Sequence, residues 1–310
     1  MWTKDGIEYE PDERHAEKVV SDLGLEKARE VSTPCIPEVA DKKKNKEDNG
    51  KIVLKPQDAT KFRGIAARIN YLAADRPDLQ FASKGASKYM ANPTLDGWEV
   101  LKRIGRYLKA NPRMVQKFEW TGWDTELQGY ADSDWAGDKS NYKSTSGGAL
   151  MWGPHALKTW ATSQSTIALS SGEAELYAMM KAAVQIKGMM SLAKDFEADL
   201  KGVVRSDSSA AIGIAHREGL GGRCRHINVQ YLWVQERVRE GQLRLRKVLG
   251  KNNPADMMTK AVSMETIQQH LKFMNFASLA GRAEKASKLL NSIAPSMDES
   301  RSWGCRNSCP

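Results

Sequence analysis

One run in the middle of the chain, Leu127-Gln128-Gly129-Tyr130-Ala131-Asp132-Ser133-Asp134, indicates which architecture to expect. Apolar and polar residues alternate along it, as in a β-strand with one buried face. The run ends in acidic residues, of which Asp132 is the candidate for a functional role and Asp134 is expected to be structural or peripheral. It therefore predicts a strand that carries a carboxylate to the edge of a sheet.

The segments around this strand predict a mixed sheet covered by helices. Further β-prone runs lie at 148–152, 157–161, 203–207 and 243–249. Helical patterns lie at 169–193, 208–215 and 227–240, and another begins at Pro254. Three strands before the first helix, followed by alternating helices and strands, are typical of an α/β (α+β) domain with a five-stranded mixed sheet.

Four carboxylates fall on four different elements of this predicted domain. Asp132 lies on the first strand, Glu175 in the long helix, Asp207 at the end of the fourth strand and Asp256 in the first turn of the last helix. Clustered carboxylates repel one another unless they share cations, and their hard oxygen atoms suit Mg²⁺ or Mn²⁺. Two such ions could support phosphodiester hydrolysis. From spacing alone, a solvated strand end or a helix cap is the favoured interpretation of each aspartate.

The charge of the chain favours a polyanionic partner. Lys and Arg number 47 against 38 Asp and Glu, a formal net charge of +9. Between Lys61 and Lys117, twelve basic residues face only four acidic ones. This excess indicates nucleic acid before membrane, although a solvated basic face is the alternative. The residues expected to contact phosphate groups are Arg103, Arg106, Lys109, Arg113 and Lys117.

Membrane and secreted classes are excluded as leading interpretations. No run approaches the roughly 18–20 apolar residues that cross a bilayer. The first residues lack an apolar signal core, and four cysteines do not suggest a disulfide framework. We therefore expect an intracellular protein without a membrane partner.

Composition divides the chain into five segments. Residues 1–35 contain an amphipathic helical stretch, and residues 36–57 form a charged linker. Residues 58–121 carry three helical patterns, at 59–73, 77–90 and 94–109, and 122–275 hold the mixed sheet. Residues 276–310 predict a short helix, at 280–290, and a disordered tail.

Several ordered motifs resemble the polyproteins of copia-type retrotransposons. Five segments resemble the ribonuclease H domain of these polyproteins: the run that begins at Gly129, Lys143–Gly148, Ala168–Ala178, Ser206–Ala211 and Ala255–Lys260. Upstream, five further motifs resemble the end of their reverse transcriptase: Tyr71–Ala73, Arg76–Asp78, Asn92–Thr94, Trp98 and Arg106–Lys109. The resemblance covers roughly residues 8–34 and 60–270.

This resemblance implies a ribonuclease H-like sheet preceded by a helical segment like the thumb or connection of a reverse transcriptase. It also implies that Asp132, Glu175, Asp207 and Asp256 bind two Mg²⁺ ions, with Mn²⁺ as the alternative, and cleave the RNA strand of an RNA–DNA hybrid. Glu173 is the rival of Glu175. Because residues two apart on a helix point about 200° from each other, only one can face the sheet edge, and the family motif favours Glu175.

Departures from the family pattern leave other interpretations open. Asn228 stands where the family has an aspartate, and 248–254 contain no histidine. No Tyr-x-Asp-Asp pair occurs upstream, so polymerase activity is not expected without the rest of a polyprotein. The alternatives are an inactive relic that only binds nucleic acid and another nuclease of the same superfamily. The family would place the protein in the cytoplasm, within a virus-like particle, or in the nucleus.

Overall fold

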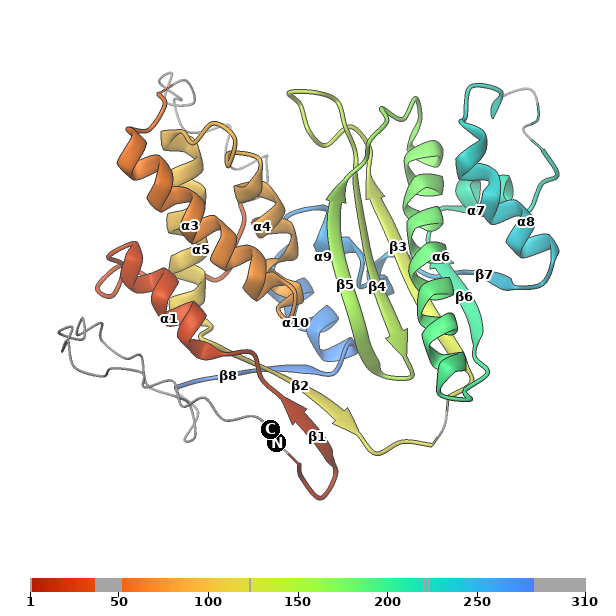
Figure 1. Cartoon of the computed structure of the whole chain (residues 1–310), viewed down its shortest axis with the longest axis horizontal. Helices are drawn as coiled ribbons and strands as arrows, with labels where there is room; N and C mark the ends of the chain where they lie inside the picture. The colour runs from red at the N-terminus through yellow and green to blue at the C-terminus, as the bar shows by residue number, and fades with distance from the viewer. Residues whose placement is uncertain (1, 37–51, 123, 220, 222–223, 282–310) are drawn as a thin grey trace, which may run out of the picture.

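A computed structural model describes residues 2–36, 52–122, 124–219, 221 and 224–281. A five-stranded sheet with its helices lies beside a helical block, and a smaller sheet runs below that block (Figure 1). Within the described residues, no helix combines the length and the apolar character that crossing a bilayer requires.

The larger sheet is mixed, as the sequence predicts. Its strand order is β5-β4-β3-β6-β7. The pairs β3–β4 and β4–β5 are antiparallel, whereas β3–β6 and β6–β7 are parallel. The strands span Glu126–Asp134 (β3), Thr145–Trp152 (β4), His155–Ser163 (β5), Lys201–Ser206 (β6) and Leu243–Lys247 (β7). The predicted fold class, an α/β domain with a five-stranded mixed sheet flanked by helices, is confirmed.

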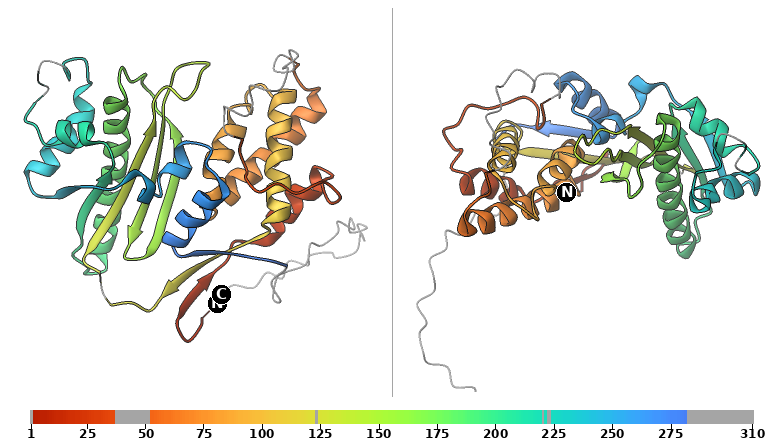
Figure 2. Two further views of the ribbon diagram at one scale, coloured as in Figure 1. Left: turned by 180° about the vertical axis from the view of Figure 1, so that it is seen from behind. Right: turned by 90° about the horizontal axis from the view of Figure 1, so that it is seen from above.

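Helices cover both faces of this sheet. The long helix α6 (Ser171–Asp195) packs on one face, and α9 (Asp256–Thr259) and α10 (Met264–Phe273) lie on the other, as the two orientations in Figures 1 and 2 show. Because side chains alternate along a strand, β3 contributes Ala131 to the core under α6 and Tyr130 to the core under α9 and α10. The remaining elements lie at the β7 edge: α7 (Ser209–Ala215), η4 (Val229–Leu232), α8 (Trp233–Arg239) and the turn η5 (Gly250–Asn252).

Gly147 of β4 allows α9 to approach the sheet closely. It pairs with Asp132 across the β3–β4 ladder. A Cβ atom at this position would lie 2.6 Å from Cγ2 of Thr259 and 2.9 Å from the carbonyl oxygen of Ala255. Only glycine leaves room for these atoms, so Gly147 lets the end of α9 lie next to Asp132.

The helical block has its own core. It consists of α1 (Glu13–Asp22), α3 (Pro56–Ala73), η2 (Pro77–Leu79), α4 (Gln80–Ser87) and α5 (Leu95–Ala110). These confirm the predicted helices. Asp12 and Thr94 cap α1 and α5 by accepting hydrogen bonds from backbone N–H groups of the first turn. The apolar faces of the helices meet around Phe62, Ile69 and Ile104, all of which are fully buried.

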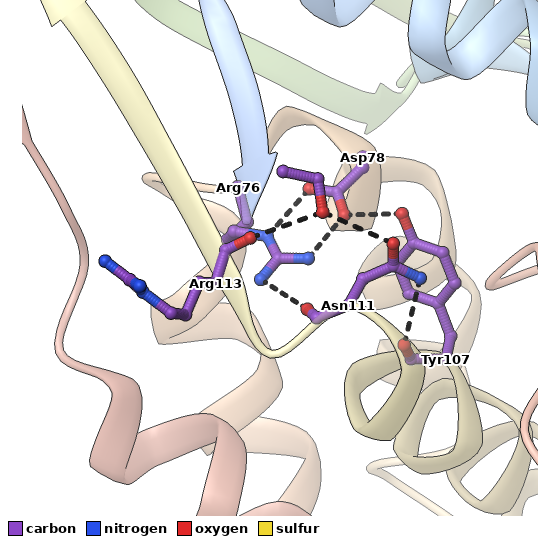
Figure 3. Close-up of polar contacts among 6 residues, drawn as sticks. Arg76, Asp78, Tyr107, Asn111 and Arg113 are labelled. Carbon is purple, nitrogen blue, oxygen red and sulfur yellow. Dashed lines mark hydrogen bonds and ion pairs between the residues drawn. The ribbon is translucent and has the colours of Figure 1, made fainter. Parts of the chain in front are cut away.

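A buried ion pair joins these helices at the base of the block (Figure 3). Arg76 donates two hydrogen bonds to Asp78, at 3.0 and 2.7 Å, and a third to the carbonyl oxygen of Asn111 at 3.1 Å. Tyr107 donates its hydroxyl hydrogen to Asp78 at 2.8 Å. The charges are compensated in full, which a buried ion pair needs if it is not to destabilise the fold.

The smaller sheet was not predicted. β1 (Gly6–Tyr9) and β8 (Phe276–Leu279) pair on either side of β2 (Arg113–Glu119), both antiparallel. The sequence patterns at 58–121 predict only helices, and this prediction is wrong at β2. Those at 276–310 predict a helix and a tail, and this prediction is wrong at β8. β1 and β8 have only four residues each, and the partners of all three strands are distant in the chain, so little local signal marks them. The helix expected at 280–290 falls outside the described residues from position 282 on.

Side-chain contacts join the helical block to the larger sheet. Gln80 donates to the carbonyl oxygen of Thr159 at 3.2 Å, and Lys84 donates to Oγ1 of Thr145 at 2.5 Å. The expected linker at 36–57 lies mostly outside the described residues, but its end is ordered: Val53 forms a β-bridge with Thr94, and α3 begins at Pro56.

Candidate active site

Asp132 lies near the end of β3, buried between the sheet and α9. Its Oδ2 accepts a hydrogen bond from the hydroxyl group of Thr259. Burial raises the pKa of Asp132 to about 6. The hydrogen bond from Thr259 lowers this pKa, and the nearby charges of Asp256 and Asp207 raise it further. The strand thus brings a carboxylate to the sheet edge in an environment that disfavours its charged form.

Glu175 lies in the second turn of α6. The helix begins at Ser171 because Ser170 caps it, its hydroxyl oxygen accepting from the backbone N–H of Glu173. Oε1 of Glu175 accepts from the backbone N–H of Ser133 at 3.3 Å, whereas Oε2 is buried and accepts from no described residue. Burial, followed by the charges of Asp132 and Asp207, raises the pKa of Glu175 to about 9.

Asp207 follows β6 and completes a three-carboxylate cluster. Ser208, the next residue, caps α7 by accepting from the backbone N–H of Ala211, which fixes the turn. One carboxylate oxygen each from Asp132, Glu175 and Asp207 lies within 4.8 Å of the other two. Three separate elements therefore converge, as the sequence predicts for these residues.

Asp256 is close to this cluster but is not a member of it. Its charge contributes to the raised pKa values of Asp132 and Glu175. Its own Oδ1 lies 2.8 Å from Nζ of Lys260, one turn further along the chain. The structure therefore brings together three of the four predicted acids, and pairs the fourth with a lysine.

Glu173, the rival of Glu175, has a different role. It accepts hydrogen bonds from the hydroxyl group of Tyr177 and the backbone N–H of Leu169, and its Oε2 lies 3.0 Å from Nε2 of His226. Burial raises its pKa, but these hydrogen bonds outweigh burial and leave the pKa below its ordinary value. Glu173 thus holds the start of α6 to the segment before η4, and Glu175 is the helix residue in the cluster.

Asp134 is held by the neighbouring strand. Its carboxylate accepts from both the backbone N–H and the hydroxyl group of Thr145. Residues two apart share a face of a strand, so these bonds, rather than strand alternation, keep Asp134 apart from Asp132. Its expected structural role agrees with these contacts.

Two of the predicted phosphate contacts lie on β2 and have acidic partners. Arg113 lies 2.7 Å from Glu10 and 3.2 Å from Glu13. Lys117 is exposed and lies 3.6 Å from Glu8. Arg113 therefore helps to attach the N-terminal segment to the small sheet.

The other three predicted contacts lie on α5, and each is half-buried. Arg103 donates to the hydroxyl oxygen of Thr33 at 2.8 Å, and Lys109 lies 3.6 Å from Glu30. Nε of Arg106 is buried and has no hydrogen-bond acceptor within the described chain. As phosphate contacts, all five basic residues stay predictions.

The carboxylate cluster fits a divalent cation. All its potential ligands are hard oxygen atoms, which Mg²⁺ and Mn²⁺ prefer. Oε2 of Glu175 is buried and accepts no hydrogen bond from a described residue, and the raised pKa values of Asp132 and Glu175 reflect first their burial and then the negative charges near them. A divalent cation would offset that cost.

Two residues around the cluster were missed as functional candidates. Thr259 and Lys260 belong to the motif Ala255–Lys260 that carries the family resemblance, but the sequence indicated no role for them. Their spacing from Asp256 is the available signal: three and four residues onward lie on the same side of a helical turn.

No family model matches the chain. The Pol polyprotein of transposon RE2 from Arabidopsis thaliana is 32% identical over 226 residues, which cover 72% of this chain and 15% of that protein. The Pol polyprotein of transposon TNT 1-94 from Nicotiana tabacum is 30% identical over 255 residues, covering 81% of this chain and 19% of that protein. The chain thus spans less than a fifth of the length of these relatives.

Among solved structures, the chain is similar to an RNase H1 isolated from compost by a metagenomic approach. The two are 14% identical, the match covers 47% of this chain and 99% of the other, and the TM-score is 0.32. The chain is homologous to a segment of the retrovirus-related Pol polyproteins of transposons, which it matches at about 30% identity over most of its own length.

Proposed function

We propose that this chain is a ribonuclease H that cleaves the RNA strand of RNA–DNA hybrids and leaves a 3′-hydroxyl and a 5′-phosphate. The observation that carries the proposal is the convergence of Asp132, Glu175 and Asp207 within 4.8 Å, near the carboxyl ends of the neighbouring strands β3 and β6. Similarity to the Pol polyproteins of transposons supports a nucleic-acid substrate.

In this proposal the acids hold two divalent cations, Mg²⁺ or Mn²⁺. Asp132, Glu175 and Asp207 supply the shared oxygen ligands, and Asp256 supplies a further carboxylate. Cations at such a site supply activation of a water molecule and stabilisation of the leaving oxygen in phosphodiester hydrolysis. The hydrogen bond from Thr259 fixes the orientation of the Asp132 carboxylate, and the one from the backbone of Ser133 fixes that of Glu175.

The basic helical block would hold the hybrid by its phosphate groups. Because a hybrid is recognised by its geometry and its 2′-hydroxyl groups, contacts need not be base-specific. Arg103 and Arg106 are the residues to test: replacing both with alanine should weaken hybrid binding and reduce its dependence on salt by about one to two released counterions. The rest of a reverse transcriptase is the protein partner that this proposal implies.

Cleavage of a labelled RNA–DNA hybrid tests the activity, with duplex DNA of the same sequence as the comparison. Wild-type protein should cut only the RNA strand, and only with Mg²⁺ or Mn²⁺. Asp207→Asn retains the size of the side chain and removes an anionic ligand, so cleavage should fall by at least about a thousandfold while hybrid binding persists. Asp195→Asn, at the exposed end of α6, is the matched control and should cut normally.

The alternative of an inactive relic makes the opposite forecast. Wild-type protein would then bind the hybrid, with the salt dependence of phosphate contacts, and would not cut it with either ion. Cutting of duplex DNA in preference to the hybrid would instead favour another nuclease of the superfamily.

A further inference from the structure

A lysine ammonium group lies beside Asp256, close to the three-carboxylate cluster. Nζ of Lys260 is 2.8 Å from Oδ1 of Asp256, and the two residues are four apart, at either end of α9. The side chain of Lys260 is 54% exposed and that of Asp256 18%. Burial alone would lower the pKa of Lys260, but the hydrogen bond to Asp256 and the charges of Asp256, Asp132 and Asp207 outweigh burial and raise it. Lys260 therefore interacts electrostatically with Asp132 and Asp207 as well as with Asp256.

We propose that Lys260 is an intramolecular counter-cation. It holds Asp256 apart from the three-carboxylate cluster, and it competes with divalent cations for the carboxylate of Asp256. Lys260 would thereby set the affinity of the site for these ions. The inference rests on the proposed function in one respect, namely that the cluster binds a divalent cation.

The geometry of α9 supports this assignment. Its end presents two consecutive side chains to the acids: buried Thr259 donates to Asp132, and Lys260 pairs with Asp256. Thr259 has a short side chain and is fixed by packing, whereas Lys260 has a flexible four-carbon stem that is half in solvent. The ammonium group can therefore withdraw into water, at little cost in packing, when another cation takes its place beside Asp256.

Electrostatics gives the direction and the size of the effect. A carboxylate that is paired with an ammonium group is a poorer ligand, and the ammonium charge also repels a divalent cation nearby. A unit charge about 6 Å from a divalent cation changes its binding constant by about tenfold in a medium with the dielectric constant of water. Removing the charge of Lys260 should therefore tighten divalent-ion binding by about tenfold.

Isothermal titration calorimetry with Mg²⁺ and with Mn²⁺ tests this on the full chain, without nucleic acid and at constant ionic strength. Lys260→Met retains the apolar stem and removes the charge, and it should bind ions about tenfold more tightly than wild type. Lys260→Arg retains the charge and should bind like wild type. Lys272→Met, an exposed position on α10, removes an equal charge elsewhere and should also bind like wild type.

A double variant tests whether the effect passes through Asp256. In an Asp256→Asn background, Lys260→Met should tighten binding by a smaller factor than in wild type, because only charge repulsion remains once the carboxylate for which the two cations compete has been removed. Equal tightening in the two backgrounds would overturn the proposal, since Lys260 would then act only as a distant charge. Equal affinities of wild type and Lys260→Met would also overturn it, and would leave the proposed metal-dependent function intact.

The remaining outcomes separate the two proposals. Binding by Lys260→Met where wild type shows none would support the counter-cation role. If no variant bound either ion, the metal centre of the proposed function would fail, and the role of Lys260 with it. Thermal melting of each variant confirms that the exposed substitution leaves the fold intact.

Discussion

Thr259 donates its hydroxyl hydrogen to Oδ2 of Asp132, across 127 positions of the chain. The same oxygen of Thr259 lies 3.0 Å from the carbonyl oxygen of Asp256, so one side chain connects α9 to the acid on β3. The contact exists because Gly147, beside Asp132 in the sheet, leaves space for Thr259. The end of α9 thus positions one of the three clustered carboxylates.

Removing the hydroxyl group of Thr259 should impair the site without unfolding the protein. Thr259→Val has the same shape but cannot donate to Asp132, so divalent-ion affinity and hybrid cleavage should each fall by about 10–100-fold, the usual effect of losing such a supporting bond. Thr259→Ser restores the hydroxyl group and should recover most of both. Calorimetry and single-turnover cleavage measure the two effects, and equal loss in the Ser and Val variants would refute the role of the hydrogen bond.

Alanine at Gly147 should displace α9. The added Cβ atom would meet Thr259 and the backbone of Ala255 at distances that real contacts do not reach. We expect Gly147→Ala to destabilise the fold by about 1–3 kcal/mol and to abolish cleavage. Gly188→Ala provides the control, because this exposed glycine of α6 faces open space and alanine there should stabilise the helix by up to about 1 kcal/mol. Urea unfolding curves of both variants measure the difference.

The stability of the junction between the helical block and the larger sheet should depend on pH through Lys84. Burial first, and then the charge of Lys88, lower the pKa of Lys84 to about 8, although Asp134 and Asp138 act in the opposite direction. The unfolded chain, with a pKa near 10.5, then binds more protons than the folded chain between about pH 8 and 10.5, so this group makes stability rise with pH in that window.

Lys84→Met removes this contribution and keeps the apolar stem. The variant should exceed wild type in free energy of unfolding by about 1–2 kcal/mol at pH 7, and the excess should shrink as the pH rises to 10. Urea unfolding at pH 7, 8.5 and 10 measures it. An excess that is the same at all three values would show that the titration of Lys84 is not its cause.

The buried ion pair of Figure 3 should be among the most sensitive points of the helical block. Asp78→Ala leaves the guanidinium of Arg76 buried without its counter-charge and should destabilise the fold by about 3–5 kcal/mol. Tyr107→Phe removes one hydrogen bond and should cost about 1 kcal/mol. The exposed pair Lys102–Glu99 is the control, and Lys102→Met should change stability by less than about 0.5 kcal/mol. A loss for Asp78→Ala as small as that of the control would refute the structural role of the pair.

The sequence by itself determined the elements of the larger sheet and of the helical block, and their order. Alternation at 127–134 and the helical patterns at 59–109 are local signals, because hydrophobic period depends on neighbours a few residues away. Family motifs added the acids that should meet. These signals were sufficient for the mixed sheet and for its helices, and three of the four acids that they named, Asp132, Glu175 and Asp207, lie together in the structure.

Tertiary structure alone decided which of these groups meet and which groups are already engaged. β1, β2 and β8 are strands because distant segments supply their hydrogen-bond partners, which no local pattern records. Arg113 has Glu10 as its partner for the same reason. Asp256 and Lys260 share a local spacing that permits an ion pair. Only the packing of α9 against β4 places that pair beside three other carboxylates, where the positive charge of Lys260 acts on Asp132 and Asp207 as well as on Asp256.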